Sequence, residues 1–248
     1  MKKTKKDKNI WAISDIHGRN DLLQLLMKKL ETDEKLDLNE DKLVFLGDYI
    51  DRGPDSFEVL VYVRDLFSKY PDNVVILGGN HEKLAIDACV RGMNYDDVYL
   101  WSINGGDRTR DSIENNLGVR NFPQDWLRWL INLPLFHKEP GFFFSHAPLP
   151  RESFRQVHRR GQPFDRDDYT WTYNRDEFGV ARDIGKGTIG VCGHVHALRN
   201  GVMEPRLYTH YYYVDAGCGC SLKAPLVAVE VQTKKVIYAW PKELKDED

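Results

Sequence analysis

Asp15-Ile16-His17-Gly18 is the first of three polar blocks, and Gly47-Asp48-Tyr49-Ile50-Asp51-Arg52-Gly53 and Gly79-Asn80-His81-Glu82 follow it. Each block begins where a short apolar run ends, at Ile10–Ile13, Leu43–Leu46 and Val74–Leu77. Such runs, followed by glycine and a helical pattern, predict strand–loop–helix units of a βαβ fold. Open α/β sheets bind ligands at strand ends, so we expect the Asp, His and Asn side chains to meet there. Oxygen and imidazole donors without a thiolate suit two divalent metals, which predicts a two-metal hydrolase.

The three blocks resemble motifs of the calcineurin-like metallophosphoesterases, and within them of the phosphoprotein phosphatase family, especially its bacterial and phage members. Later segments resemble motifs of the same family and occur in the same order: Trp101-Ser102-Ile103-Asn104-Gly105-Gly106, Ser145-His146-Ala147, Cys192-Gly193-His194 and Asp215-Ala216-Gly217-Cys218. The resemblance runs from Asp15 to Cys220, which is most of the chain. A single D-x-H is weak, but the ordered set is highly specific.

The spacing of apolar residues predicts helices and strands along the chain. Helices are expected over Asn20–Glu31, Pro54–Lys69, Lys83–Arg91 and Asp125–Leu133, the first of them capped by Asn20 or Asp21. In the second helix, we expect the inward residues to be Phe57, Leu60, Val61, Val63 and Phe67. After Pro140 the pattern predicts strands over Phe142–Ser145, Thr188–Cys192, Tyr211–Val214, Leu226–Val231 and Lys235–Trp240.

This order of elements predicts an α/β fold of two packed sheets with helices outside. The family resemblance implies the same fold, a metallophosphatase β-sandwich of two mixed sheets flanked by helices, with a dinuclear metal site at the strand ends. The motifs span both halves of the 248 residues, so we expect one domain over residues 9–241. Residues 1–8 read as a disordered basic tail and residues 242–248 as an acidic tail. The stretch Leu149–Asp183 has little periodicity and is expected to form loops or short helices over the active site.

Bulk composition excludes several classes of protein. Hydrophobic residues at 42% and charged residues at 29% are ordinary for a globular protein with a sizeable core. The net charge of -3 gives no electrostatic footprint for nucleic acid or an anionic membrane. The basic start is followed by no long apolar run, so we expect no signal peptide, no membrane anchor and a cytoplasmic location. In that compartment Cys89, Cys192, Cys218 and Cys220 would be reduced, as small buried or turn residues.

The family resemblance implies which residues hold the metals. Asp15 and His17 would bind one metal, and Asp48 would bridge the two with its carboxylate. The other metal would be bound by Asn80, His146 and His194. A bridging carboxylate holds two cations roughly 3.5–4 Å apart, close enough to share a hydroxide that attacks phosphorus directly. We expect manganese in this site, with iron, zinc or cobalt as alternatives.

The resemblance also implies a phosphate clamp and a general acid. Arg52 and Arg175 would bind phosphate oxygens through their guanidinium groups, which keep their charge. The segment around Arg175, Tyr173-Asn174-Arg175-Asp176-Glu177-Phe178, resembles the bacterial W-x-R-x-x-F with Tyr for Trp, and Arg166 and Arg182 are nearby alternatives. His81 would protonate the departing serine or threonine oxygen, and Asp51 would accept from its other ring nitrogen.

His196 in Gly193-His194-Val195-His196 has two readings. The wider superfamily uses the second histidine of G-x-H as a ligand of the first metal, whereas the phosphoprotein phosphatase branch usually lacks that ligand. His196 is therefore either a metal ligand or a residue at the rim of the site. No motif surrounds His137, His158 or His210, which we expect to be structural or exposed.

The predicted function is that of a metal-dependent phosphomonoesterase of the serine/threonine protein phosphatase type, acting on phosphorylated proteins or peptides. The nearest rival is a bis(5′-nucleosyl)-tetraphosphatase or other nucleotide phosphohydrolase on the same scaffold, and small phosphoesters or nucleotides are possible substrates. Such tetraphosphatases resemble this chain but typically lack the Asp of D-R-G and have Asp after N-H. Asp51 and Glu82 therefore favour the protein phosphatase. A catalytically dead binding protein is a third class, and its signature would be a missing ligand or acid, none of which is missing here.

Overall fold

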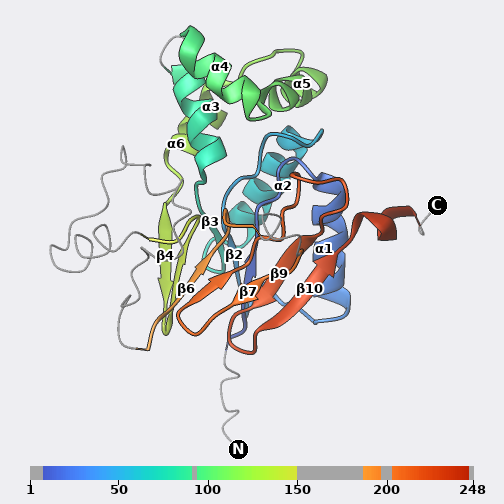
Figure 1. Ribbon diagram of the computed structural model, residues 1–248, viewed down its shortest axis with the longest axis vertical. Coiled ribbons are helices and arrows are strands. Elements are labelled where there is room, and N and C mark those ends of the chain that lie inside the picture. Colours follow the sequence, from blue (N-terminus) through green and yellow to red (C-terminus); the bar gives the residue numbers. More distant parts are fainter. Residues whose placement is uncertain (1–7, 91–93, 150–186, 197–202, 246–248) are drawn as a thin grey trace, which may run out of the picture.

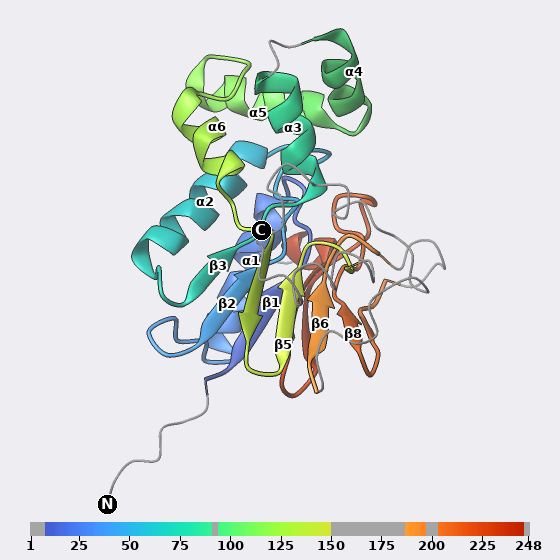
Figure 2. The same ribbon diagram turned by 90° about the vertical axis from the view of Figure 1, so that its left-hand side faces the viewer.

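Two mixed β-sheets pack face to face at the centre of the molecule (Figures 1 and 2). The computed structural model describes residues 8–90, 94–149, 187–196 and 203–245. Within these residues the first sheet has the order β10-β9-β1-β2-β3, with β1 at Ile10–Ile13, β2 at Lys42–Phe45, β3 at Val74–Ile76, β9 at Leu226–Glu230 and β10 at Lys235–Ala239. The second has the order β4-β5-β6-β8-β7, with β4 at Phe136–Glu139, β5 at Phe142–Ser145, β6 at Ile189–Cys192, β7 at Arg206–Leu207 and β8 at Tyr211–Tyr213.

The parallel strands β1, β2 and β3 of the first sheet are each followed by a loop and a helix. In the first sheet β1, β2 and β3 run parallel, and β9 and β10 close its edge as antiparallel neighbours. In the second sheet β5, β6 and β8 run parallel, between the antiparallel strands β4 and β7. The carboxyl ends of parallel strands meet at one edge of a sheet, so the loops that follow them converge. The predicted sandwich of two mixed sheets is confirmed.

Helices occupy two regions of the structure. Helices α1 (Asn20–Thr32) and α2 (Ser56–Lys69) cover the outer face of the first sheet (Figure 1). Helices α3 (Asn80–Val90), α4 (Tyr95–Ile103), α5 (Gly106–Leu117) and α6 (Gln124–Ile131) gather beyond the strand ends (Figure 2). None of the described helices is both long and apolar enough to cross a membrane.

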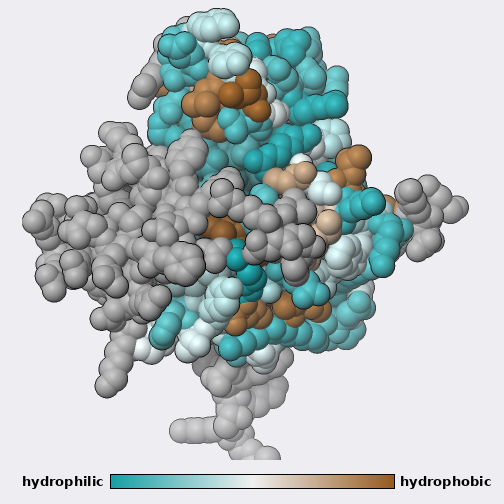
Figure 3. Space-filling model, viewed as in Figure 1, coloured by the Kyte–Doolittle hydropathy of each residue, from teal (hydrophilic) through white to brown (hydrophobic). Residues whose placement is uncertain are grey.

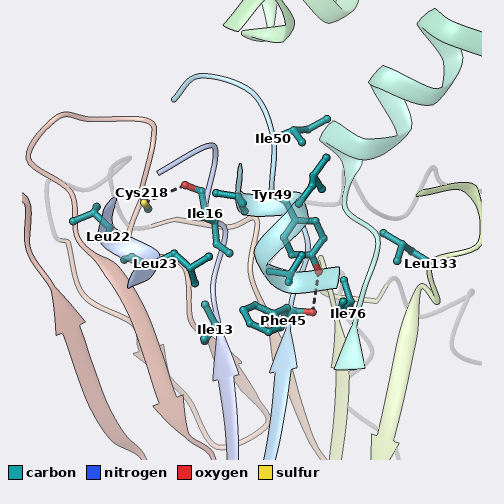
Figure 4. Packing of buried hydrophobic residues seen from close by; sticks show 14 of the residues in the cluster. Ile13, Ile16, Leu22, Leu23, Phe45, Tyr49, Ile50, Ile76, Leu133 and Cys218 are labelled. Carbon is teal, nitrogen blue, oxygen red and sulfur yellow. Dashed lines mark hydrogen bonds between the residues drawn. The ribbon is translucent and has the colours of Figure 1, made fainter. Parts of the chain in front are cut away.

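Alternation along the strands divides the core into two layers. Ile13 and Phe45 face the helices and belong to the larger apolar cluster, together with Leu23 of α1. Figure 4 shows how these side chains pack below the loop that carries Tyr49. The intervening residues of β1 and β2 face the second sheet in a separate cluster, which contains Ile10, Ala12, Val44, Phe144, Val191 and Tyr212. Burial on both sides of the first sheet explains its continuous apolar runs.

Two local predictions were wrong. The first helix has Arg19 at its N-cap with no side-chain cap bond, and its guanidinium donates instead to the Asp21 carboxylate at 2.8 and 2.6 Å. Phe67, expected to face the core, is 39% exposed. It lies at the end of α2 and lines an open apolar groove beside β3. Because β3 is a short edge strand, it does not cover that end of the helix.

The described segment after β10 packs against α1. Residues 242–245, assigned to an acidic tail by the sequence, lie in a 3₁₀ helix over Pro241–Lys245. Glu243 in this helix pairs with the Lys29 amine at 2.6 Å. Residues 242–245 of the predicted tail are therefore packed against α1.

Candidate metal centre

Six of the predicted site residues follow the carboxyl ends of parallel strands. The loops after β1 and β2 supply Asp15, His17 and Asp48, and those after β5 and β6 supply His146 and His194, while Asn80 is the first residue of α3, which follows β3. All six side chains are buried. Burial of a charged or polar group costs free energy because the group loses its water, unless it binds another group or a ligand. The convergence of six such side chains therefore indicates a binding site.

The buried donors form two groups that share Asp48. His17, Asp48 and His81 offer ligand atoms within 4.8 Å of one another, and so do Asp48, His146 and His194. Asp48 Oδ2 lies 3.6 Å from His17 Nε2, while Asp48 Oδ1 lies 3.4 Å from His146 Nε2. Each donor group therefore faces a different oxygen of the Asp48 carboxylate. That is the arrangement expected of a carboxylate that bridges two cations.

The histidine tautomers fit metal binding. His17 Nδ1 lies 2.9 Å from the Ile50 carbonyl oxygen, and His146 Nδ1 lies 2.9 Å from that of Leu46. A carbonyl oxygen only accepts, so both Nδ1 atoms carry the proton and both Nε2 atoms keep a lone pair for a metal. Burial lowers the pKa of His17 well below its usual value, with the charges of Arg52 and His81 in the same direction, which keeps its ring neutral.

Asp48 is ionised in these surroundings. Burial would raise its pKa, but the four imidazoles around it, above all that of His146, outweigh burial and lower the pKa. His146 Nε2 also lies 2.9 Å from Asn80 Oδ1, which gives the second group an amide oxygen as a further ligand atom. Oxygen and imidazole ligands of this kind suit manganese, iron, zinc or cobalt. The residues present therefore fit two divalent cations.

Asp15 lies beside the second group without being one of its members. Both of its carboxylate oxygens accept from the His194 backbone amide at 3.1 Å. Burial raises the pKa of Asp15 well above its usual value, and the nearby charges of Asp215 and Asp48 raise it further. A cation would relieve this repulsion between three carboxylates. Asp215 had no predicted role, although it falls in one of the motifs.

The motif glycines are required by close contacts to these carboxylates. A Cβ atom at Gly193 would lie 2.1 Å from Asp15 Oδ1, and one at Gly79 would lie 2.2 Å from Asp48 Oδ1. No side chain fits at either position. Backbone strain gathers at the same place, since positive φ angles occur at His17, Asp48, Asp51, Arg52 and His194. Strained loop residues are typical of sites whose geometry is held for function.

The predicted contact between His81 and Asp51 is present. His81 Nδ1 lies 2.7 Å from Asp51 Oδ2, and the Asp51 side chain is fully buried. Burial lowers the pKa of His81, but the charge of Asp48 and the hydrogen bond and charge of Asp51 outweigh it, so the pKa is raised overall. His81 Nε2 lies 3.9 Å from Asp48 Oδ2, which places the ring inside the first donor group. Geometry alone therefore allows His81 to act as an acid or as a ligand.

Two residues that the sequence did not predict hold Asp51 in place. Trp101 Nε1 donates to Asp51 Oδ1 at 2.9 Å, and the Thr109 hydroxyl donates to the same oxygen at 2.6 Å. The Asp51 amide in turn donates to the Thr109 hydroxyl at 2.8 Å. Trp101 was visible as part of W-x-x-N-G-G, but Thr109 follows no motif, and its helix shows no apolar period that would have revealed it.

Arg52 points into the site. Its Nη1 lies 2.6 Å from His17 Nε2, and its Nη2 lies 3.0 Å from His81 Nε2. Nη1 also donates to the sulfur of Cys220 at 2.7 Å, a contact between residues at opposite ends of the sequence. The Arg52 guanidinium thus lies next to the first donor group and His81. Arg175, the second predicted clamp, lies outside the described residues.

Among the described residues, the remaining histidines and the cysteines lie outside the two donor groups. His196 is not a member of either donor group. His137 pairs with Glu139 at 2.8 Å, and His210 is exposed, whereas His158 lies outside the described residues. The four cysteines, all within the described residues, form no disulfide, and Cys192 and Cys218 are buried.

Glu82 connects two of the site loops through hydrogen bonds to their backbone amides. Its carboxylate accepts from the backbone amides of Asp48, Tyr49 and Gly79 at 2.9, 2.9 and 2.8 Å. Burial raises the pKa of Glu82 to about 7, with the charge of Asp48 in the same direction, against the effect of the three amides. The residue therefore ties the second polar block to the third and fixes the position of the Asp48 backbone.

Glu82→Gln should destabilise the protein. An amide side chain presents one carbonyl oxygen, so at least one of the three backbone donors would face an NH₂ group. We expect a loss of about 2–3 kcal/mol in the free energy of unfolding, seen as a Tm about 4–10 °C lower in chelator. Glu114→Gln, at an exposed surface pair with Arg120, is the matched control. Equal Tm values for the two variants would contradict the role given to Glu82.

Comparisons with known proteins agree with this geometry. Residues 8–198 match the family model for calcineurin-like phosphoesterase. Serine/threonine-protein phosphatase 1 of Salmonella typhimurium is 37% identical over 100 residues, or 40% of each chain. The symmetrical bis(5′-nucleosyl)-tetraphosphatase of Methylococcus capsulatus is 29% identical over 142 residues, or 57% of this chain and 43% of the relative. The chain thus spans about two fifths of the length of these curated relatives.

One solved structure extends the likeness to most of the fold. A protein serine/threonine phosphatase from Saccharomyces cerevisiae with similarity to human phosphatase PP5 superposes with a TM-score of 0.57. The match covers 90% of this chain and 73% of that one at 17% sequence identity. At that identity the likeness concerns the fold.

Proposed function

This chain belongs to the calcineurin-like phosphoesterase family, and on that premise we propose that it is a metal-dependent phosphatase that removes phosphate from serine and threonine side chains of proteins. The observation that carries this proposal is the His81–Asp51 contact of 2.7 Å beside Arg52. A serine or threonine alkoxide is a poor leaving group and gains from protonation, whereas the phosphate of a nucleotide leaves without it. An acid dyad in this place therefore favours the protein substrate.

Each residue of the site has a part in this proposal. Asp15 and His17 would hold one cation and Asn80, His146 and His194 the other, with Asp48 shared between them. Such a pair of cations would supply Lewis-acid activation of water and would neutralise charge on the phosphate. The protein groups would align the phosphate, hold a proton at His81 Nε2 and deliver it to the departing oxygen. Asp51 would keep His81 protonated and aimed by accepting from Nδ1.

Arg52 would bind the non-reacting oxygens of the phosphate. Its guanidinium offers two nitrogens toward the site and cannot lose its charge. Cys220 accepts from Nη1 and so fixes the rotation of the group. A lysine would provide charge at this position without the fork of donors.

Arg175→Ala tests the second clamp, which stays a prediction. If Arg175 binds phosphate, the variant should keep both its metals and its fold. Its kcat/KM should fall by about 10–100-fold, the usual cost of losing one hydrogen bond to a charged group. Arg166→Ala and Arg182→Ala are matched controls from the same segment. Wild-type activity in Arg175→Ala together with a loss in either control would move the clamp to that residue.

A nucleotide substrate is the second candidate. It is favoured by the relatives named symmetrical bis(5′-nucleosyl)-tetraphosphatase, whose matches extend over more than half of this chain. For the protein phosphatase proposed above, we also propose a cytoplasmic location and manganese as the resident metal.

Metal removal tests the proposal at its base. Enzyme treated with a chelator should release no phosphate from a phosphothreonine peptide, and added manganese should restore release, with iron, zinc and cobalt assayed in parallel. The absence of a C-x(5)-R loop from the sequence leaves no phosphatase cysteine to carry the reaction. Full activity in chelator, with metal content confirmed as zero, would overturn the proposal.

A further inference from the structure

Helix α4 carries apolar side chains on opposite faces. Its inner face buries Trp101 and packs Val98 against the core. Its outer face exposes Tyr95 by 79%, Tyr99 by 55% and Ile103 by 61%. These three residues recur every four positions and so form one line along the helix, which we call the α4 stripe. Figure 3 shows apolar surface on this upper, helical part of the molecule.

The stripe is unusual for an exposed surface. Single exposed apolar residues are ordinary, but a line of them on a helix whose other side is already buried is not. Tyr95 and Tyr99 stack on each other, with ring centroids 6.0 Å apart and planes 9° from parallel. A flat pair of stacked rings is a preformed platform for another apolar or aromatic group.

The stripe leads directly to the candidate active site. Helix α4 ends at Ile103, and two residues later the Gly105 carbonyl accepts from the Arg52 amide at 3.3 Å. On the inner face of the same helix, Trp101 holds Asp51. Nine helical residues span roughly 13 Å, which about four residues of extended chain would cover. A polypeptide whose phosphorylated residue lies at Arg52 could therefore run along the stripe.

The charge around the stripe selects a basic partner. Helix α4 carries the carboxylates of Asp96 and Asp97 and no basic residue. The carboxylates of α5 at Asp107, Asp111 and Glu114 pair instead with Arg110 and Arg120. A segment with lysine or arginine next to apolar residues would complement both features.

We propose that the α4 stripe docks the segment of a phosphoprotein substrate that flanks its phosphorylated serine or threonine. Apolar or aromatic residues of that segment would lie on Tyr95, Tyr99 and Ile103, and its basic residues would meet the carboxylates of Asp96 and Asp97. This inference rests on the proposed function and specifies its substrate: a polypeptide with basic and apolar flanks. Docking of this kind lowers KM for long substrates and leaves small phosphoesters unaffected.

The test uses a double variant at the far end of the stripe, Tyr95→Ser with Tyr99→Ser. These positions are remote from Gly105, so the site geometry should persist. Three substrates are compared: a phosphothreonine peptide with lysine and leucine on both sides, the same peptide with serine and glutamate there, and p-nitrophenyl phosphate. We expect kcat/KM for the basic peptide to fall about tenfold through KM, as for loss of one contact of moderate strength. The other two substrates should change less than twofold.

Phe67→Ser is the matched control, because Phe67 is also an exposed aromatic residue but lies on α2. It should leave all three substrates unchanged. Equal kcat/KM of wild type and double variant on the basic peptide would overturn the docking role. The docking role would also be overturned if sedimentation showed that the wild type is a dimer and the double variant a monomer, because a second copy of the chain would then cover the stripe. Failure of the proposed function looks different, since neither peptide would then be hydrolysed while p-nitrophenyl phosphate still is.

Discussion

Asp48→Asn should remove both metals at once and with them the activity. Asp48 faces His17 with one carboxylate oxygen and His146 with the other, and the surrounding imidazoles lower its pKa despite its burial. An asparagine keeps the shape but supplies one neutral oxygen. The Lewis-acid contribution of the cations is worth several kcal/mol, so we expect kcat to fall by about 10³-fold or more. Elemental analysis of dialysed protein should find two equivalents of metal in the wild type and less than one in the variant.

The control for this variant is Asp41→Asn. Asp41 is also a buried carboxylate that accepts from backbone amides, those of Asn9 and Asp37, but it lies outside the donor groups. The Asp41→Asn variant should be less stable than the wild type but should keep its metals. One equivalent of metal in fully active wild-type enzyme would contradict the dinuclear site, and an Asp48→Asn variant that keeps both metals would contradict the bridging role of Asp48.

His81→Asn should slow the enzyme in proportion to how badly the leaving group needs a proton. General acid catalysis contributes typically about 10²–10⁴-fold, and we expect a loss of this size on a phosphothreonine peptide. p-Nitrophenolate leaves without much help, so p-nitrophenyl phosphate should suffer far less. Measuring kcat on both substrates separates chemistry from binding.

Metal content decides between the two roles that geometry allows for His81. As an acid, it can be replaced while both metals stay bound, whereas loss of a ligand would release one of them. Asp51→Asn should show the same bias between substrates in a milder form, because it disturbs the aim of His81 and leaves the ring in place. Equal losses on the two substrates, or loss of one equivalent of metal from His81→Asn, would show that His81 is not the acid.

Much of the fold could be predicted because its strands have a clear signal. The strand over Ile10–Ile13 was predicted with the bounds that the structure has, since both of its faces are buried and its apolar run is continuous. The first two helices were located within two residues because each has one apolar face. The site loops could be placed because they follow such strands.

Other elements lacked a signal of this kind. Helix α5 is mostly polar and buries Thr109 and Ser112 through hydrogen bonds to Asp51 and Glu58, so no apolar period marks it. Helix α4 has the opposite problem, because apolar residues on both faces hide its period. The contact between Arg52 and Cys220 joins residues 168 positions apart and depends on tertiary structure alone.

The buried acceptors around the site show a second limit of sequence reasoning. Glu82 served in the sequence as a mark of substrate class, yet in the structure it holds three backbone amides. A motif can indicate that a residue matters without telling whether it binds substrate or supports a loop. The stability and metal measurements on Glu82→Gln and Asp48→Asn separate these two kinds of role.

The most direct test of the proposed function is a competition between the two substrate classes that the family admits. Enzyme loaded with manganese is given a phosphothreonine peptide or diadenosine tetraphosphate, and kcat/KM is measured for each, with chelator as the blank. With Asp51, Arg52 and His81 together at the site, kcat/KM should be higher for the phosphothreonine peptide. Hydrolysis of diadenosine tetraphosphate that far outpaces the peptide would contradict the assignment as a protein phosphatase.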